Sequence, residues 1–244
     1  MDPVTFTSVR LASGAMVLAL VLLLARRSRP AGGTFGSALA LFAYAAGFSL
    51  AYVRIGAGVG SMLLFAAVQL TMVGWPAMRG ARPRPLQLGG LAVAFAGLAW
   101  LALPGASAPD ALGTVLMLGA GAAWGAYSLR GRRAGDPLAT TAHNFLLGLP
   151  LALALSAGLA GSRSATGEGV ALAVASGALA SGGGYSLWYA VVPVLGATRA
   201  AAVQLAVPVL AGAGATVFLG EQLTPRVAAS GLAILGGIAL TLRR

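Results

Sequence analysis

The sequence FSLAY at residues 48–52 is matched by YSLWY at residues 185–189, about 137 residues further along the chain. Other short matches follow in the same order and at nearly the same offset. They pair Asp2-Pro3 with Asp136-Pro137, Gln69-Leu70 with Gln204-Leu205, Gly80 with Gly220, Pro85 with Pro225, and GLAV at 90–93 with GLAI at 231–234. A chance alignment of Ala- and Leu-rich segments would not keep this order, so we infer that the chain consists of two related halves.

The composition of both halves indicates that the solvent is a lipid bilayer. Hydrophobic residues make up 58% of the 244 residues, charged residues only 9%, and the mean hydropathy is +0.88. Soluble domains carry about 25% charged residues, so this chain would not cover its surface in water. Gly occurs 36 times, which suits helices that pack closely in lipid. The sequence therefore predicts an all-α integral membrane protein.

Apolar segments long enough to cross a bilayer, which takes about 20 residues, follow one another along the chain. There are nine such segments, at residues 5–25, 36–54, 58–78, 86–103, 111–129, 139–160, 168–192, 197–219 and 224–242. Matched segments stand five spans apart, an odd number, so the halves are predicted to have opposite orientations. The segment at 111–129 has no counterpart in the first half. We expect an inverted repeat of helical halves, residues 1–104 and 105–244, with nine transmembrane helices on a ten-helix plan that lacks the first helix.

The arginines predict the orientation of the chain, because basic residues gather in cytoplasmic loops. Counted on alternate sides of the nine spans, twelve arginines fall on one side and four on the other. The twelve are Arg26, Arg27, Arg29, Arg79, Arg82, Arg84, Arg130, Arg132, Arg133, Arg199, Arg243 and Arg244, and the four are Arg10, Arg54, Arg163 and Arg226. The prediction is a multi-pass protein of the cell (plasma or inner) membrane with a cytoplasmic C-terminus.

Several classes of function are disfavoured by the residues that the chain lacks. The net charge of +11 comes from arginines between apolar runs and not from a nucleic-acid-binding patch. With no Cys, one His and five scattered acids, no metal site, cofactor site or carboxylate-based enzyme is expected. Ser181 and His143 do not lie in a protease motif. We therefore predict a lipid-embedded protein that binds no nucleic acid and is not an enzyme.

The second half carries a pattern that points to a family. It contains FLGE at 218–221, LTP at 223–225, GLAI at 231–234, Pro208 in the preceding segment, and Trp124 and Arg130 ahead of Asp136-Pro137. This pattern resembles the EamA-type branch of the drug/metabolite transporter superfamily. The resemblance implies two fused five-helix halves that carry a small organic metabolite or drug by alternating access.

The chain departs from that family pattern in two places. The first helix of the first half is absent, and Gly80-Ala81 stands where the second half has Gly220-Glu221. If the first helix of each half lines the pathway, one flank of the chain is open to lipid. Three interpretations follow: the native start lies upstream, the chain needs a partner such as a second copy of itself, or the chain does not transport.

Candidate substrate-binding residues are polar or aromatic groups inside the apolar segments. Gln69 and Gln204 occupy matching mid-helix places, and a buried amide needs a hydrogen bond, so they either link helices or line a shared cavity. Trp124 and Tyr127 share one helix face in the middle of a span. Tyr185 and Ser186 belong to the repeated motif and fit either a cavity or an interfacial aromatic belt.

Two titratable residues are candidates for coupling transport to an ion. His143 is the single His, and its titration range allows proton coupling. Glu221 stands at the junction before the last segment, where it is either a proton or cation site or a structural residue beside Thr224 and Pro225, which suit the start of a helix.

Overall fold

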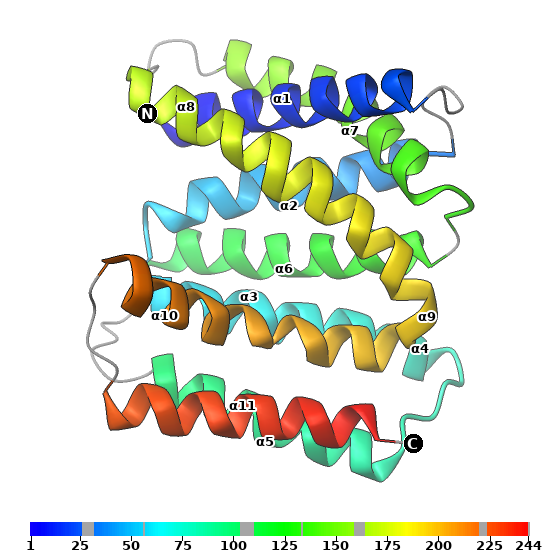
Figure 1. Ribbon diagram of the computed structural model, residues 1–244, viewed down its shortest axis with the longest axis vertical. Helices are drawn as coiled ribbons and strands as arrows, with labels where there is room; N and C mark the ends of the chain where they lie inside the picture. Colours follow the sequence, from blue (N-terminus) through cyan, green and yellow to red (C-terminus); the bar gives the residue numbers. More distant parts are fainter. Residues whose placement is uncertain are drawn as a thin grey trace.

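The computed structural model describes residues 1–25, 32–55, 57–102, 110–132, 134–158, 164–219 and 224–243, and every regular element in these ranges is helical (Figure 1). In the first half they are α1 (Pro3–Leu24), α2 (Phe35–Tyr52), α3 (Ala57–Gln69), η1 (Leu70–Gly74), α4 (Trp75–Met78) and α5 (Pro85–Ala102). In the second half they are α6 (Ala111–Gly131), α7 (Pro137–Gly158), α8 (Gly167–Ala175), η3 (Ser176–Gly183), α9 (Gly184–Gln204), α10 (Ala206–Leu219) and α11 (Pro225–Leu242). The segments η1 and η3 are wide π-helical turns inside longer helices.

Seven helical runs among the described residues are long and apolar enough to cross a membrane. One of them, Gly167–Gln204, contains Gly196, whose backbone dihedrals φ 73° and ψ 168° are not helical. Glycine adopts a positive φ without the steric penalty of a Cβ, so the chain turns here. Figure 1 shows α9 crossing the molecule obliquely before the chain returns toward α10. This turn lies between the predicted segments 168–192 and 197–219.

Matching residues of the repeat begin matching helices. The Asp2 carboxylate accepts hydrogen bonds from the Val4 and Thr5 amides at the start of α1, at 3.1 and 2.9 Å. The Asp136 carboxylate does the same for Leu138 and Ala139 at the start of α7. In both, a proline follows the cap, where its missing N–H and fixed φ suit a first turn. The repeated Asp-Pro pair is therefore a helix start.

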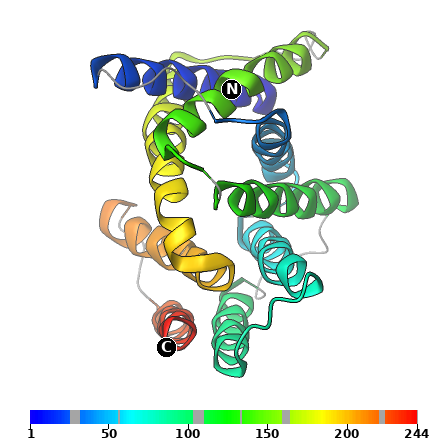
Figure 2. The same ribbon diagram turned by 90° about the vertical axis from the view of Figure 1, so that its right-hand side faces the viewer.

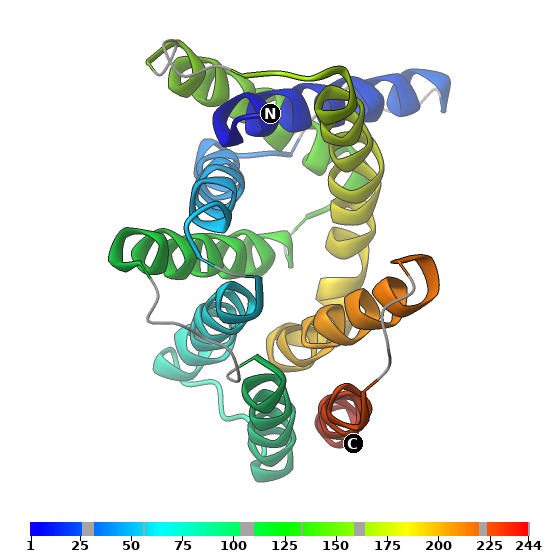
Figure 3. The same ribbon diagram turned by 90° about the vertical axis from the view of Figure 1, so that its left-hand side faces the viewer.

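Helices that match in the repeat also pack against each other in the bundle. Helix α1 contacts α7 at one end of the molecule, and α5 contacts α11 at the other end (Figure 2). Between them, α2, α6 and α3 form one side, and α9 and α10 form the other (Figure 3). Small residues allow the closest pairs to meet: a Cβ added at Gly237 would lie 2.5 Å from the Gly90 carbonyl oxygen.

Candidate functional site

A buried arginine lies where α1, α2 and the second half meet. Arg10, in the second turn of α1, is 8% exposed. Its Nε donates a hydrogen bond to Ser181 Oγ at 2.7 Å, and one Nη donates to Tyr185 Oη at 2.5 Å. The guanidinium carbon also lies 5.8 Å from the centre of the Tyr44 ring. Arg10 therefore links the first half to η3 and α9 of the second half.

The charge of Arg10 has no acidic partner among the described residues, where the one ion pair is Arg54–Asp110 at 3.6 Å. The Ser181 and Tyr185 hydroxyls and the Tyr44 ring are among the contacts that compensate its desolvation. The arginine count placed Arg10 with three others on one side of the membrane, and the structure places its side chain in the packed interior beside α1 and not in a loop. A charged side chain inside a membrane helix and facing the bundle interior marks a functional site.

Glycines bring α1 close enough to η3 for these bonds to form. A Cβ at Gly14 would meet the Phe145 ring and the Gly177 carbonyl oxygen, and one at Gly177 would collide with the Arg10 carbonyl and Ser13 Oγ. Gly177 lies within η3, whose wide turns also carry Ser181 toward Arg10. π-Helical turns of this kind are frequent at functional sites.

Aromatic rings from α2, α6 and α9 surround Tyr185 and form what we call the aromatic cluster. Its members are Tyr44, Trp124, Tyr127, Tyr185 and Tyr189. The Trp124 ring centre lies 4.8 Å from that of Tyr44 and 4.7 Å from that of Tyr185. Tyr127 and Tyr189 stack at 4.6 Å, and both are buried. Tyr185 and Tyr189 thus lie in the interior of the helix bundle.

Each glutamine of the repeat reaches into the other half. Gln69 Nε2, at the end of α3, donates to the Ala201 carbonyl oxygen in α9 at 2.9 Å. Gln204, in α9, accepts a hydrogen bond from Trp124 Nε1, and its Nε2 donates to Met72 Sδ at 3.1 Å. The amides therefore link helices, and Gln204 also connects to the aromatic cluster through Trp124.

The remaining predicted site residues lie elsewhere. Ser186 Oγ donates to the Gly182 carbonyl oxygen at 2.9 Å, so its hydroxyl bonds to its own helix. His143 lies in α7 next to Gly33, near the start of α2, and its buried Nδ1 has no hydrogen-bond partner in the part of the chain that the structure describes. Glu221 lies outside the described residues.

The sequence missed three residues that the structure brings together: Arg10, Tyr44 and Ser181. One signal for Arg10 was available, because it is the single charged residue inside the apolar segment 5–25. Ser181 had been considered only as a protease nucleophile, and its contact with Arg10 spans 171 residues of sequence.

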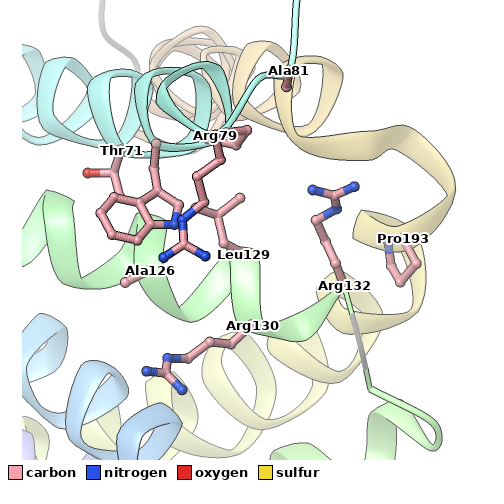
Figure 4. A pocket seen from close by; sticks show the side chains of 10 residues that line it. Thr71, Arg79, Ala81, Ala126, Leu129, Arg130, Arg132 and Pro193 are labelled. Atoms are coloured by element: carbon pink, nitrogen blue, oxygen red, sulfur yellow. The ribbon is translucent and has the colours of Figure 1, made fainter.

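A pocket of about 810 Å³ opens at the ends of α4 and α6 (Figure 4). Its lining residues are Thr71, Trp75, Pro76, Arg79, Ala81, Ala126, Leu129, Arg130, Arg132 and Pro193. Three of these are arginines and none is acidic, and the Arg79 guanidinium lies 4.5 Å from the centre of the Trp75 ring. Helix α6 supplies both Leu129 at this pocket and Trp124 at the aromatic cluster. The pocket therefore lies along the same helix as the buried site.

Metal chemistry receives no support from the part of the chain that the structure describes, which holds no group of three or more His, Cys, Asp or Glu side chains able to bind a metal ion.

The sequence pattern of the EamA-like transporter family matches residues 111–243, more than half of the chain. The chain belongs to the EamA-like transporter family. This places the aromatic cluster and its arginine in a multi-pass membrane protein of a transporter family. An uncharacterized Pseudomonas aeruginosa protein, PA1977, is 51% identical to this EamA-like chain over 242 residues, which cover 99% of this chain and 84% of that protein. A solved crystal structure with 18% sequence identity covers 99% of this chain and 89% of its own, with a TM-score of 0.84. That likeness shows that the EamA-like fold is shared.

Proposed function

We propose that this EamA-like protein is a secondary carrier that moves a small organic metabolite or drug by alternating access between two inverted helical halves. In this proposal the chain crosses the cell membrane nine times, as residues 1–104 and 105–244, with its C-terminus in the cytoplasm. The inward side then holds the arginines of the pocket, in line with the charge bias of the loops. Inverted repeats of this kind bind their solute near the midplane, at the boundary of the halves.

One observation carries the proposal: polar side chains bond across the boundary between the halves, and two of them, Arg10 and Gln204, also bond to the aromatic cluster. Arg10 of the first half bonds to Ser181 and Tyr185 of the second. The matched amides, Gln69 and Gln204, each bond across the same boundary. A boundary held by a few hydrogen bonds between polar groups can exchange them for bonds to a solute, which is what a site that opens to alternate sides requires.

Transport and alternating access are tested together in proteoliposomes. The wild type is screened for uptake of a panel of labelled small carboxylates, amines and neutral solutes. Because the chain has no Cys, Ala126→Cys in the pocket gives a single reporter, and its labelling by an impermeant maleimide is measured with and without the transported solute. We expect uptake of at least one solute, and a change of the labelling rate when that solute is present. Absence of uptake of every solute, with labelling unchanged, would contradict the proposal.

A second candidate is an assembly-dependent member of the family that transports only with a further helix beside α9. It is favoured by two glycines at matching places: Gly47 is covered by Leu116 and Ala120 of α6, whereas a Cβ at Gly184 would meet no atom within 4 Å. A second copy of the chain is one partner that would cover Gly184. Gly184→Cys tests this, because a homodimer through α9 gives a disulfide-linked dimer in membranes, and Val53→Cys, at the end of α2, serves as the exposed control.

A further inference from the structure

The buried site has the chemistry of an anion receptor. Resting on the proposed transport function, we infer that Arg10 binds the carboxylate of a singly charged amphipathic solute, whose apolar part contacts Tyr44, Trp124 and Tyr185. The substrate class is then an aryl- or alkyl-substituted monocarboxylate.

The first support is the balance of charge. Arg10 is a permanent cation, it is 8% exposed, and within the described ranges no carboxylate lies within ion-pair distance of it. A monoanion would neutralise it, whereas a neutral or cationic solute would leave the buried charge uncompensated. A dianion would need a second buried cation, and the neighbours of Arg10 that are described here are hydroxyls and rings.

The second support is the supply of hydrogen-bond donors. A guanidinium has five N–H donors in a planar fork that fits a carboxylate with two parallel bonds. Ser181 and Tyr185 now accept two of these bonds. When a carboxylate replaces them as acceptor, both hydroxyls can rotate to donate to its oxygens. The same three side chains would then supply the hydrogen-bond donors of the anion site.

The third support is the apolar and aromatic surface beside Arg10. The rings of Tyr44 and Tyr185 lie 4.8 and 4.7 Å from Trp124, and Phe145 lies 6.1 Å from Tyr185. Displacement of one ring from such a group leaves aromatic faces for an aryl or branched alkyl group. A purely polar anion, such as inorganic phosphate, would have no partner for these faces.

The fourth support is the charge along the approach. The pocket at the ends of α4 and α6 is lined by Arg79 and Arg132 without a lining acid, and Arg130 also borders it, although its guanidinium points toward Gly36 of α2 (Figure 4). A pocket lined by one sign of charge raises the local concentration of solutes of the opposite sign. Trp124, held by Gln204, stands on α6 between the pocket residues and Tyr185. The pocket and the buried site thus favour the same sign of solute.

Matched probes that differ in one group test the inference. They are radiolabelled 3-phenylpropionate, its neutral amide, 3-phenylpropylamine and 2-phenylethylphosphonate, and equilibrium binding to purified protein in detergent is measured at about pH 9, where the phosphonate is a dianion and the amine is still a cation. We expect the carboxylate to bind at least about tenfold more tightly than each of the other three, because only it pairs one buried charge with one opposite charge. Equal binding of carboxylate and amide, no binding of any probe, or preference for the phosphonate would overturn the inference.

Variants connect the preference to Arg10. Arg10→Gln should remove the preference for carboxylate over amide, and Arg10→Lys should keep part of it, since a point cation remains without the planar fork. Tyr185→Phe removes one hydroxyl and should weaken carboxylate binding without changing amide binding. Arg54→Gln, which removes an exposed arginine, is the matched control and should bind as the wild type does. If Arg10→Gln fails to fold, Arg10→Lys and Tyr185→Phe still decide the outcome.

Failure of this inference is distinguishable from failure of the transport proposal. Carboxylate binding that depends on Arg10, without uptake of any solute into proteoliposomes, would support the anion site and contradict transport. Uptake of a neutral or cationic solute that Arg10→Lys leaves unchanged would support transport and overturn the anion site.

Discussion

At the scale of single residues, the Asp2 carboxylate holds the start of the chain in place by hydrogen bonds to two segments. It caps α1, and its second oxygen accepts a hydrogen bond from the Ser164 amide at 2.9 Å, ahead of α8. Burial raises the pKa of the Asp2 carboxyl, but hydrogen bonds from Thr5, Ser164 and Val4 outweigh burial and lower it from 3.8 to about 2. The ionised form is therefore the one that the folded protein stabilises.

A pH dependence of stability follows from that lowered pKa. The folded pKa lies below the unfolded value of 3.8, so the contribution of Asp2 is fully present above that pH and is lost as the pH falls toward about 2. Asp2→Asn keeps a good helix cap but cannot ionise. The midpoint temperature of thermal unfolding in detergent, measured as the pH is lowered from 5 to 2, should fall more steeply for the wild type than for this variant. Equal slopes would contradict the role of the carboxylate.

At the scale of helices, the contact between α1 and η3 depends on Gly177, a position where the packing leaves no room for a side chain. A Cβ at Gly177 would collide with the Arg10 carbonyl and Ser13 Oγ, whereas a Cβ at Gly183, in the same π-helical segment, would meet nothing within 4 Å. We expect Gly177→Ala to lower the stability by about 1–3 kcal/mol, the usual cost of overpacking, and Gly183→Ala to be neutral or slightly stabilising.

The measurement for this pair is chemical unfolding in micelles, together with carboxylate binding. Gly177→Ala should also weaken binding, because it separates Arg10 from Ser181. If both alanine variants behave alike, the close approach of α1 and η3 is not what positions the arginine.

Local chemistry explains which elements were predictable from sequence. The caps at Asp2 and Asp136, the proline at the start of α11 and the break at Gly196 are signals that act within a few residues. The contact partners of a helical side chain are not local. The burial of Arg10 could not be predicted, because a position two turns into an apolar segment fits either a loop-facing or an inward direction, and only packing against Ser181 decides between them.

The candidate site was partly predictable for the same reason. The repeat pointed to Gln69, Gln204 and Tyr185, which the structure joins across the two halves. It also pointed to Ser186, whose hydroxyl bonds to the backbone one turn earlier, as serine in a helix often does. Sequence symmetry identifies matching places, but it does not tell which side chains face the interior.

At the scale of the whole molecule, the proposed inverted arrangement makes a prediction about which side of the membrane two residues face. Val53 follows α2, and Val194 lies near the end of the matching part of α9; both side chains are exposed, at 69% and 83%. In the proposed orientation, Val53→Cys faces outward and Val194→Cys faces the cytoplasm. An impermeant maleimide should label Val53→Cys in intact cells and Val194→Cys only after the cells are made permeable. Labelling of both in intact cells would contradict the inverted repeat.

Helix α6 connects the pocket to the aromatic cluster, because it carries residues of both. Leu129 and Arg130 at the pocket and Trp124 at the aromatic cluster stand within two turns of one continuous helix. A helix with its backbone hydrogen bonds intact moves as a rigid rod, so its rotation or tilt displaces the mouth of the pocket and the tryptophan together. Water or protons that leak through would need both to be displaced without a solute to fill the space. In the proposed transport cycle we therefore expect the pocket and Trp124 to move together, which would limit the leakage of water and protons while the solute passes.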